Sequence, residues 1–284
     1  MKEIWNQFAQ MYKLIEDNHT IQELQEIREL AWQLHHRAET LLAQELKEFA
    51  FNDAFLGDMY QVSDQHLFGQ CGDRIYWKIR DRNLYISGSG PMWDFDSASS
   101  GLSFKKGVSP LWRGKDFDNI IICNGVTSIG VSAFESVRAL NVIIPSTVRL
   151  LAAMAFFDAR IERLMVPETI DTIDEYVATG FSRVVDTLII SVNIPTIKPY
   201  AFFNRDDIIA NTIVLTGELP EDLTQLVESC LFDRVDCCKI YYPQEWDSAE
   251  SSFCEGLIKK FPDASDSFLL EIKKALIPHS PSNQ

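Results

Sequence analysis

The stretch IIICNGVTSIGVSAFESVRAL, residues 120–140, is followed by VIIPSTVRLLAAMAFFDARI, residues 142–161, and the apolar positions of the two coincide. Two further copies follow, LMVPETIDTIDEYVATGF at 164–181 and LIISVNIPTIKPYAFFN at 188–204. When the copies are aligned on Cys123, Pro145, Pro167 and Ser191, the intervals between these residues are 22, 22 and 24. The residues three, six and eleven positions after each of the four are apolar in every copy. This agreement predicts a repeat architecture.

Each copy contains a short β-type run, a turn and a segment ending in an Ala-Phe pair such as Ala133-Phe134. A single unit of this size cannot bury its own apolar face, so neighbouring units must stack to form a continuous core. A period of 20–29 residues with one strand is typical of leucine-rich repeats. We therefore predict an α/β leucine-rich-repeat solenoid, in which each repeat has a strand and a short helical or 3₁₀ segment. The phenylalanines are expected to stack in the core, with Phe181 filling the gap at Ala178.

Weaker copies extend the array to about five or six repeats of 22–24 residues. TIVLTGELPEDL, from Thr212, predicts a fifth strand, with Leu215 in the place of Cys123. KIYYPQEW, from Lys239, predicts a sixth. Upstream of the array, IYWKI at 75–79 and LYIS at 84–87 are two β-type runs joined by a short turn.

These segments resemble the BspA-type leucine-rich repeat proteins of bacteria. The resemblance lies in CGDRIYWKIRDRNLYISGSGPMWDF, residues 71–95, in PLW at 110–112, in GVTSIGVSAF at 125–134 and in IPSTV at 144–148. In that family a β-hairpin that begins with Cys-Gly and carries an ISGxGxM motif caps the repeat array. The resemblance implies a secreted or surface protein that acts in adhesion or protein binding.

The two ends of the chain differ from the repeats. From Lys2 to about Phe55 there is no Gly or Pro, and apolar residues recur at steps of three and four, which predicts helices over about 3–16 and 21–50. Helices are also expected over about 247–260 and 266–276. We predict a helical hairpin over 1–60, a β-hairpin cap over 61–115, the solenoid over 116–247, and C-terminal helices with a frayed tail over 248–284.

Composition excludes several classes of protein. The 284 residues include 26 Lys and Arg against 41 Asp and Glu, for a net charge of −15. Such a surface repels phosphate backbones and anionic lipids, so no nucleic-acid or membrane partner is expected. No apolar run approaches the roughly 18 residues of a membrane span. The first residues contain no signal-peptide apolar core, which predicts a cytoplasmic protein, or a surface or secreted one if a signal segment precedes this sequence.

The sequence offers no clear catalytic or metal site, so we expect no enzyme and no cofactor. Nucleophilic catalysis needs a base, usually His, and none of the five histidines lies in the repeats. The acidic residues Glu162, Glu168, Asp171, Asp174 and Glu175 are expected to form a solvated face. The cysteines are expected to be reduced, and most of them buried: Cys71, Cys123, Cys230, Cys237, Cys238 and Cys254.

The outward face of the strands is the most informative feature. If Ile122, Ile144, Val166 and Ile190 point into the core, strand alternation turns the preceding residues outward. We predict that this stripe binds a partner, and it consists of Ile121, Ile143, Met165, Ile189 and Ile213. Either the chain covers the stripe with its own helical hairpin, or a second copy covers it, or a different protein binds there. The leading hypothesis is a non-enzymatic protein-interaction module; the alternative is a surface adhesin or a host- or glycan-binding protein.

Overall fold

The computed structural model describes residues 67–97, 110–180, 185–204, 209–235, 238–247 and 252–279. The chain divides into two compact units, one of Met1–Met59, Pro243–Glu245 and His279–Gln284, the other of Tyr60–Tyr242 and Trp246–Pro278. Almost all described residues belong to the second unit. The predicted N-terminal helices lie outside the described residues.

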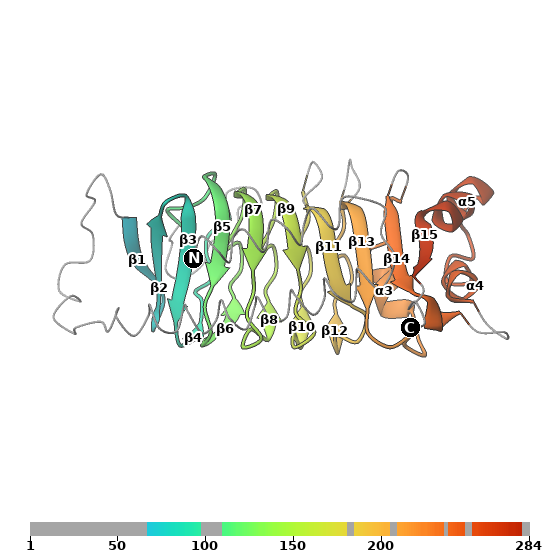
Figure 1. Cartoon of the computed structure of the whole chain (residues 1–284), viewed down its shortest axis with the longest axis horizontal. Helices are drawn as coiled ribbons and strands as arrows, with labels where there is room; N and C mark the ends of the chain where they lie inside the picture. The colour runs from blue at the N-terminus through green and yellow to red at the C-terminus, as the bar shows by residue number, and fades with distance from the viewer. Residues whose placement is uncertain are drawn as a thin grey trace, which may run out of the picture. The chain divides into compact units, whose positions relative to one another are not determined.

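A ten-stranded sheet, here called the long sheet, runs through the second unit (Figure 1). Its first three strands are antiparallel, and each strand from β3 to β14 pairs in parallel with the next. From β5 to β13 the paired residues of neighbouring strands lie 22–25 positions apart, as stacking of the predicted repeats requires. The strands, in spatial order, are β1 Leu67–Gly72, β2 Ile75–Arg80, β3 Asn83–Gly88, β5 Asp116–Ile122, β7 Arg138–Ile143, β9 Arg160–Met165, β11 Val185–Ser191, β13 Ala210–Thr216, β14 Lys239–Pro243 and β15 Leu276–His279.

A second sheet of five short strands forms another side of the stack. Each strand follows a strand of the long sheet after a turn, so that the cap strand β3 and the repeats of β5, β7, β9 and β11 contribute to both sheets (Figure 1). The buried residues of these strands are those predicted six positions after the alignment residue, for example Ile129 and Leu151. The strands are β4 Gly90–Pro91, β6 Val126–Ile129, β8 Leu150–Leu151, β10 Thr172–Ile173 and β12 Thr196–Ile197.

The third side of the stack consists of turns, where the sequence predicted short helices. A residue with positive φ recurs at the same place in four repeats: Ser132 at 52°, Met154 at 59°, Tyr176 at 58° and Tyr200 at 61°. A left-handed residue cannot continue a right-handed helix, and it costs a non-glycine residue roughly 1–2 kcal/mol. The backbone bonds to the next repeat instead: Phe134 N–H donates to the Ala155 carbonyl at 2.8 Å. The prediction of a helical segment in each of these repeats was therefore wrong.

Helices are confined to the C-terminal repeats and the end of the chain within the described residues. They are α3 Thr224–Glu228, the 3₁₀ turn η2 Gln244–Trp246, α4 Phe253–Ile258 and α5 Asp266–Ala275. The last two confirm the helices predicted there. Asp247 fixes the start of α4, because its carboxylate accepts hydrogen bonds from the Tyr242 hydroxyl at 2.8 Å and the Phe253 N–H at 2.9 Å. The pKa of Tyr242 is raised, mainly because the hydroxyl is buried and secondly because it donates a hydrogen bond to Asp247.

Aromatic rings run through the core along the first repeats. The predicted phenylalanine stack is confirmed where Phe134 and Phe156 lie parallel, with ring centroids 5.5 Å apart. Trp112 continues the series, with centroid distances of 6.3 Å to Phe134 and 5.6 Å to Phe95. Ala178 occupies the corresponding buried place in the third copy. Phe181, expected beside it, lies outside the described residues.

One ion pair lies inside this core. The Glu135 side chain is fully buried, and its carboxylate lies 3.0 Å from the Arg113 guanidinium, which is itself largely buried. The Ser97 hydroxyl donates to the other carboxylate oxygen at 3.2 Å, and Arg113 also donates to the Asp96 backbone carbonyl. The pair thus ties residues 96–97 and 113 to the turn of the first repeat.

Candidate functional site: the outward face of the long sheet

Strand β9 shows how the long sheet divides its side chains between core and surface. Ile161 and Leu164 are buried, whereas Arg160, Glu162 and Met165 are exposed. The buried residues are three positions apart rather than two, so two consecutive residues, Glu162 and Arg163, face outward. Strands β5 and β7 repeat this spacing, with buried pairs Phe117 and Ile120, and Ala139 and Val142.

An apolar row crosses the outward face, one residue from each strand. The predicted residues Ile143 and Ile189 belong to it and are half-buried, and Met165 is 45% exposed. Ile121 also belongs to it, but it is only 2% exposed although it is not part of the main hydrophobic core. The apolar row, in register order, is Tyr85, Ile121, Ile143, Met165, Ile189, Val214 and Tyr241.

Ile213 does not lie in the apolar row, and its predicted outward position was wrong. It pairs with Leu188 on β11 and Ile240 on β14, and its side chain is fully buried. The residue in register with Ile189 is Val214. A shift of one residue moves a strand side chain to the opposite face. The correct alignment residue of the fifth copy is therefore Thr216, which pairs with Ser191, and not Leu215.

Leu140 is an outward apolar residue that the sequence reading missed. It lies on β7 and is 43% exposed, close to the value for Met165 on the neighbouring strand β9. Simple two-residue alternation hides it, because the buried residues of β7 are three positions apart. Leu140 and Met165 together place two large exposed apolar side chains on adjacent strands of one sheet.

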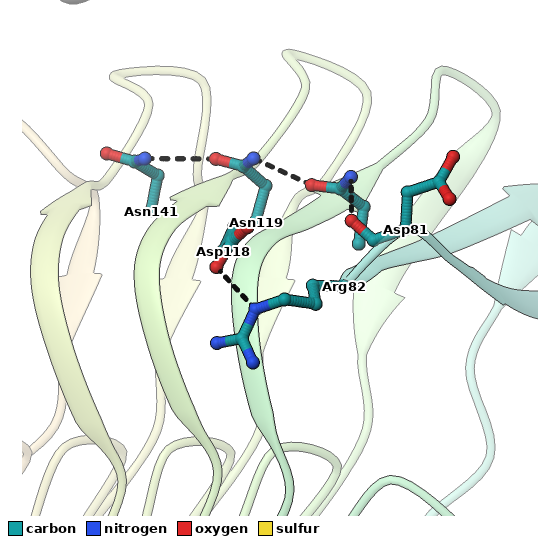
Figure 2. Close-up of polar contacts among 6 residues, drawn as sticks. Asp81, Arg82, Asp118, Asn119 and Asn141 are labelled. Atoms are coloured by element: carbon teal, nitrogen blue, oxygen red, sulfur yellow. Dashed lines mark hydrogen bonds and ion pairs between the residues drawn. The ribbon is translucent and has the colours of Figure 1, made fainter.

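Asparagine side chains on neighbouring strands of the outward face form a hydrogen-bonded ladder (Figure 2). Asn141 Nδ2 donates to Asn119 Oδ1 at 2.9 Å, and Asn119 Nδ2 donates to Asn83 Oδ1 at 2.7 Å. Asn83 Nδ2 in turn donates to the Asp81 carbonyl at 2.9 Å. Each asparagine occupies the same register position on its strand, so the side-chain bonds run parallel to the backbone ladder. The ladder holds three strands of the face in one fixed arrangement.

Replacement of Asn119 by alanine is expected to lower the free energy of unfolding by about 2 kcal/mol, because two buried hydrogen bonds are lost and both partners keep their polar groups. Chemical denaturation followed by circular dichroism measures the change. Asn211→Ala is the matched control, since Asn211 is exposed and its hydrogen bond to Asp186, at 3.1 Å, is exposed to water. An equal effect of the two substitutions would contradict a structural role for the ladder.

Surface ion pairs surround the ladder. The Arg82 guanidinium lies 2.9 Å from Asp118 Oδ1, and this hydrogen bond is the main cause that raises the pKa of Arg82 (Figure 2). Arg138 lies 3.4 Å from Asp116 on the neighbouring strand. Exposed pairs of this kind contribute little to stability, about 0–1 kcal/mol each. They neutralise the two aspartates of β5.

The remaining candidate groups form no site within the described part of the chain. No cluster of three potential metal ligands occurs among the described residues. Burial raises the pKa of the thiols of Cys123 and Cys238 to about 12, which keeps them protonated and unreactive. The predicted acidic face is solvated, and two of its members form ion pairs, Asp171 with Arg149 at 3.8 Å and Asp174 with Lys198 at 2.7 Å. Cys237 and four of the histidines lie outside the described residues.

Comparison with protein families identifies the stack of repeats. Residues 110–230 match the model of the BspA type leucine rich repeat region in six copies. This stretch is a BspA-type leucine-rich repeat region. The resemblance predicted from the sequence is thereby confirmed, as is the number of repeats. No curated protein matches the chain.

A solved structure of a leucine-rich repeat protein from Eubacterium ventriosum is similar to this chain at 16% sequence identity and a TM-score of 0.38. The similarity covers 54% of this chain and 44% of that protein, so it spans less than half of the bacterial protein's length. Within the described residues of the present chain, no helix is both long and apolar enough to cross a membrane.

Proposed function

We propose that the BspA-type repeat region is a non-enzymatic protein-interaction module, and that the outward face of the long sheet binds the partner. The observation that carries this proposal is the apolar row, in which Met165 is 45% exposed between the half-buried Ile143 and Ile189. Leu140, 43% exposed on the adjacent strand, lies on the other side of Asn141 and Arg163. Contiguous apolar patches larger than a few hundred Å² are rare on monomeric proteins and mark interaction sites. Ile143, Ile189 and Val214 extend the same surface over neighbouring strands.

The architecture supports this role because it makes the face rigid. Backbone ladders connect neighbouring repeats on the long sheet, and the repeats of β5 to β11 also on the five-stranded sheet and the turns. The asparagine ladder adds side-chain bonds on the face itself. A rigid surface loses little conformational entropy on binding, which favours affinity.

We further propose that the antiparallel strands β1 to β3 cap the first repeat. β3 pairs in parallel with β5 on one side and antiparallel with β2 on the other, which changes the strand direction at this end of the sheet. The division into a hairpin over 1–60, a cap over 61–115, a solenoid over 116–247 and C-terminal helices over 248–284 is part of the same proposal.

The proposal is tested by capture of the partner from a lysate of the source cells with the full-length chain as bait. We expect the parent chain to capture a protein that the Leu140→Asp/Met165→Asp variant does not capture. Leu270→Asp is the matched control, because Leu270 is 51% exposed on α5, at the C-terminal end of the stack (Figure 1). Identical capture by the parent and the Leu140→Asp/Met165→Asp variant would overturn the proposal.

A further inference from the structure

A polar row runs parallel to the apolar row on the outward face, two positions earlier on each strand from β3 to β14 and two positions later on the antiparallel β2. Three of its members are the ladder asparagines, and two are threonines, Thr187 and Thr212. Its charged members are Arg80 at one end, Arg163 in the middle and Lys239 at the other end. The polar row, in register order, is Arg80, Asn83, Asn119, Asn141, Arg163, Thr187, Thr212 and Lys239.

The charge of these two rows is opposite to that of the protein. On β2, Lys78 pairs with Tyr85 and therefore occupies the position that belongs to the apolar row on the other strands. The two rows across β2 to β14 therefore carry Lys78 and the three basic residues of the polar row, and they contain no aspartate or glutamate. The whole chain has 41 acidic and 26 basic residues. The pKa of Lys78 is lowered, mainly by burial of its ammonium group. The positive charge of the neighbouring Arg80 lowers it further, because like charges repel.

The acidic residues of this face lie earlier on their strands than the polar row, and most have partners. Asp81 lies 3.3 Å from Arg80, so this member of the polar row already forms an exposed ion pair. Asp116 and Asp118 pair with Arg138 and Arg82. Asp186 accepts a hydrogen bond from Asn211 at 3.1 Å. Glu162 is exposed on β9. The basic character is thus specific to the polar row and the end of the apolar row.

The spacing of the rows fits a helix laid across the strands. Successive strands lie about 4.8 Å apart, and an α-helix advances about 5.4 Å per turn. A helix along the apolar row therefore brings about one turn over each strand. Its apolar stripe would contact Ile143, Met165, Ile189 and Val214, and one flank would lie over the polar row. In an extended peptide laid across the strands, side chains on the same side of the peptide lie about 6.6 Å apart. This distance does not match the spacing of about 4.8 Å between strands.

We infer that the partner of the outward face is an acidic amphipathic helix, whose apolar stripe packs on the apolar row and whose Asp and Glu side chains on one flank face Arg163 and Lys239. This inference rests on the proposed function and specifies the chemistry of the partner. Carboxylates opposite a basic row increase the rate of association and fix the orientation of the helix. A second copy bound face to face is disfavoured, since two basic rows would repel one another.

The test uses the full-length chain and two synthetic helical peptides of about five turns. Both carry leucine at every third or fourth position; one has glutamate along one flank, and the other has lysine at the same places. Fluorescence anisotropy measures binding at low and high salt. We expect saturable binding of the glutamate peptide that weakens with salt, and weakening of at least about tenfold in Arg163→Glu/Lys239→Glu. The lysine peptide is expected not to bind.

The matched control is Arg149→Glu/Lys198→Glu, which changes the net charge equally but places the new acids beside the five-stranded sheet. It should leave the affinity unchanged, and circular dichroism checks that both variants fold. The inference is overturned by the absence of saturable binding of the glutamate peptide, by equal binding of the lysine peptide, or by an unchanged affinity of Arg163→Glu/Lys239→Glu. Saturable binding of single-stranded DNA that depends on the same two residues would assign the row to phosphates, and would also overturn it.

These outcomes are separate from those of the proposed function. If Leu140→Asp/Met165→Asp loses the cellular partner while Arg163→Glu/Lys239→Glu retains it, the face binds a protein, but the acidic helix is wrong. If both retain the partner, the proposed function itself fails.

Discussion

Replacement of Glu135 by alanine is expected to lower the free energy of unfolding by about 3–5 kcal/mol, because it leaves Arg113 charged and largely buried beside an empty space. Glu135 has no exposed surface, and its two carboxylate oxygens accept from Arg113 at 3.0 Å and Ser97 at 3.2 Å. Urea denaturation followed by tryptophan fluorescence measures the loss, since Trp112 packs next to this site.

The controls separate the ion pair from the loss of volume. Glu175→Ala removes an exposed carboxylate from the equivalent side of a later repeat and should change the free energy of unfolding by less than about 0.5 kcal/mol. Arg113→Met/Glu135→Leu replaces both charges by apolar groups and should recover much of the stability lost in Glu135→Ala. A loss below about 1 kcal/mol in Glu135→Ala would show that the pair is not buried in solution.

Replacement of Ile121 by aspartate is expected to cost about 4 kcal/mol or more, whereas the same change at Met165 should cost less than about 1 kcal/mol. Both residues belong to the apolar row, but Ile121 is 2% exposed and Met165 is 45% exposed. An aspartate at 121 would place a carboxylate out of water, while one at 165 would remain hydrated. Thermal unfolding at several protein concentrations measures both effects.

The comparison also tests whether the outward face is available. A large loss of stability for both variants at every concentration would mean that the chain itself covers Met165 in solution, which contradicts an accessible face. A loss for Met165→Asp that appears only at high protein concentration would indicate self-association through the face.

The sequence predicted the stack because its signal is repeated. Phe134 and Phe156 stand at the same place in successive copies, and a buried aromatic stack is the direct consequence of that periodicity. The asparagine ladder was also present in the sequence, since Asn119 and Asn141 occupy the same place 22 residues apart, but its third member, Asn83, lies 36 residues before Asn119 and so outside the period of the repeat.

Features that occur once could not be read from the repeat. Glu135 stands where the next copies have Phe157 and Thr179, and nothing in its neighbours indicates that it pairs with Arg113, 22 residues earlier. Ile213 was misplaced because the fifth copy lacks the proline that marks the strand end in two earlier copies. A strand without that mark leaves its register open by one residue, and one residue is enough to exchange core and surface.

The hydrogen bonds between repeats run along the stack on all three of its sides. In the described repeats of β5 to β11, such bonds join the strands of the long sheet, the strands of the five-stranded sheet and the turns, beside turn bonds that close within one repeat. A mechanical load along the stack axis is therefore carried by the repeats in series, and each interface bears the whole force. Under tension the stack should lengthen in discrete steps of one repeat, whereas a load applied along the strands would shear many bonds at once and meet far greater resistance.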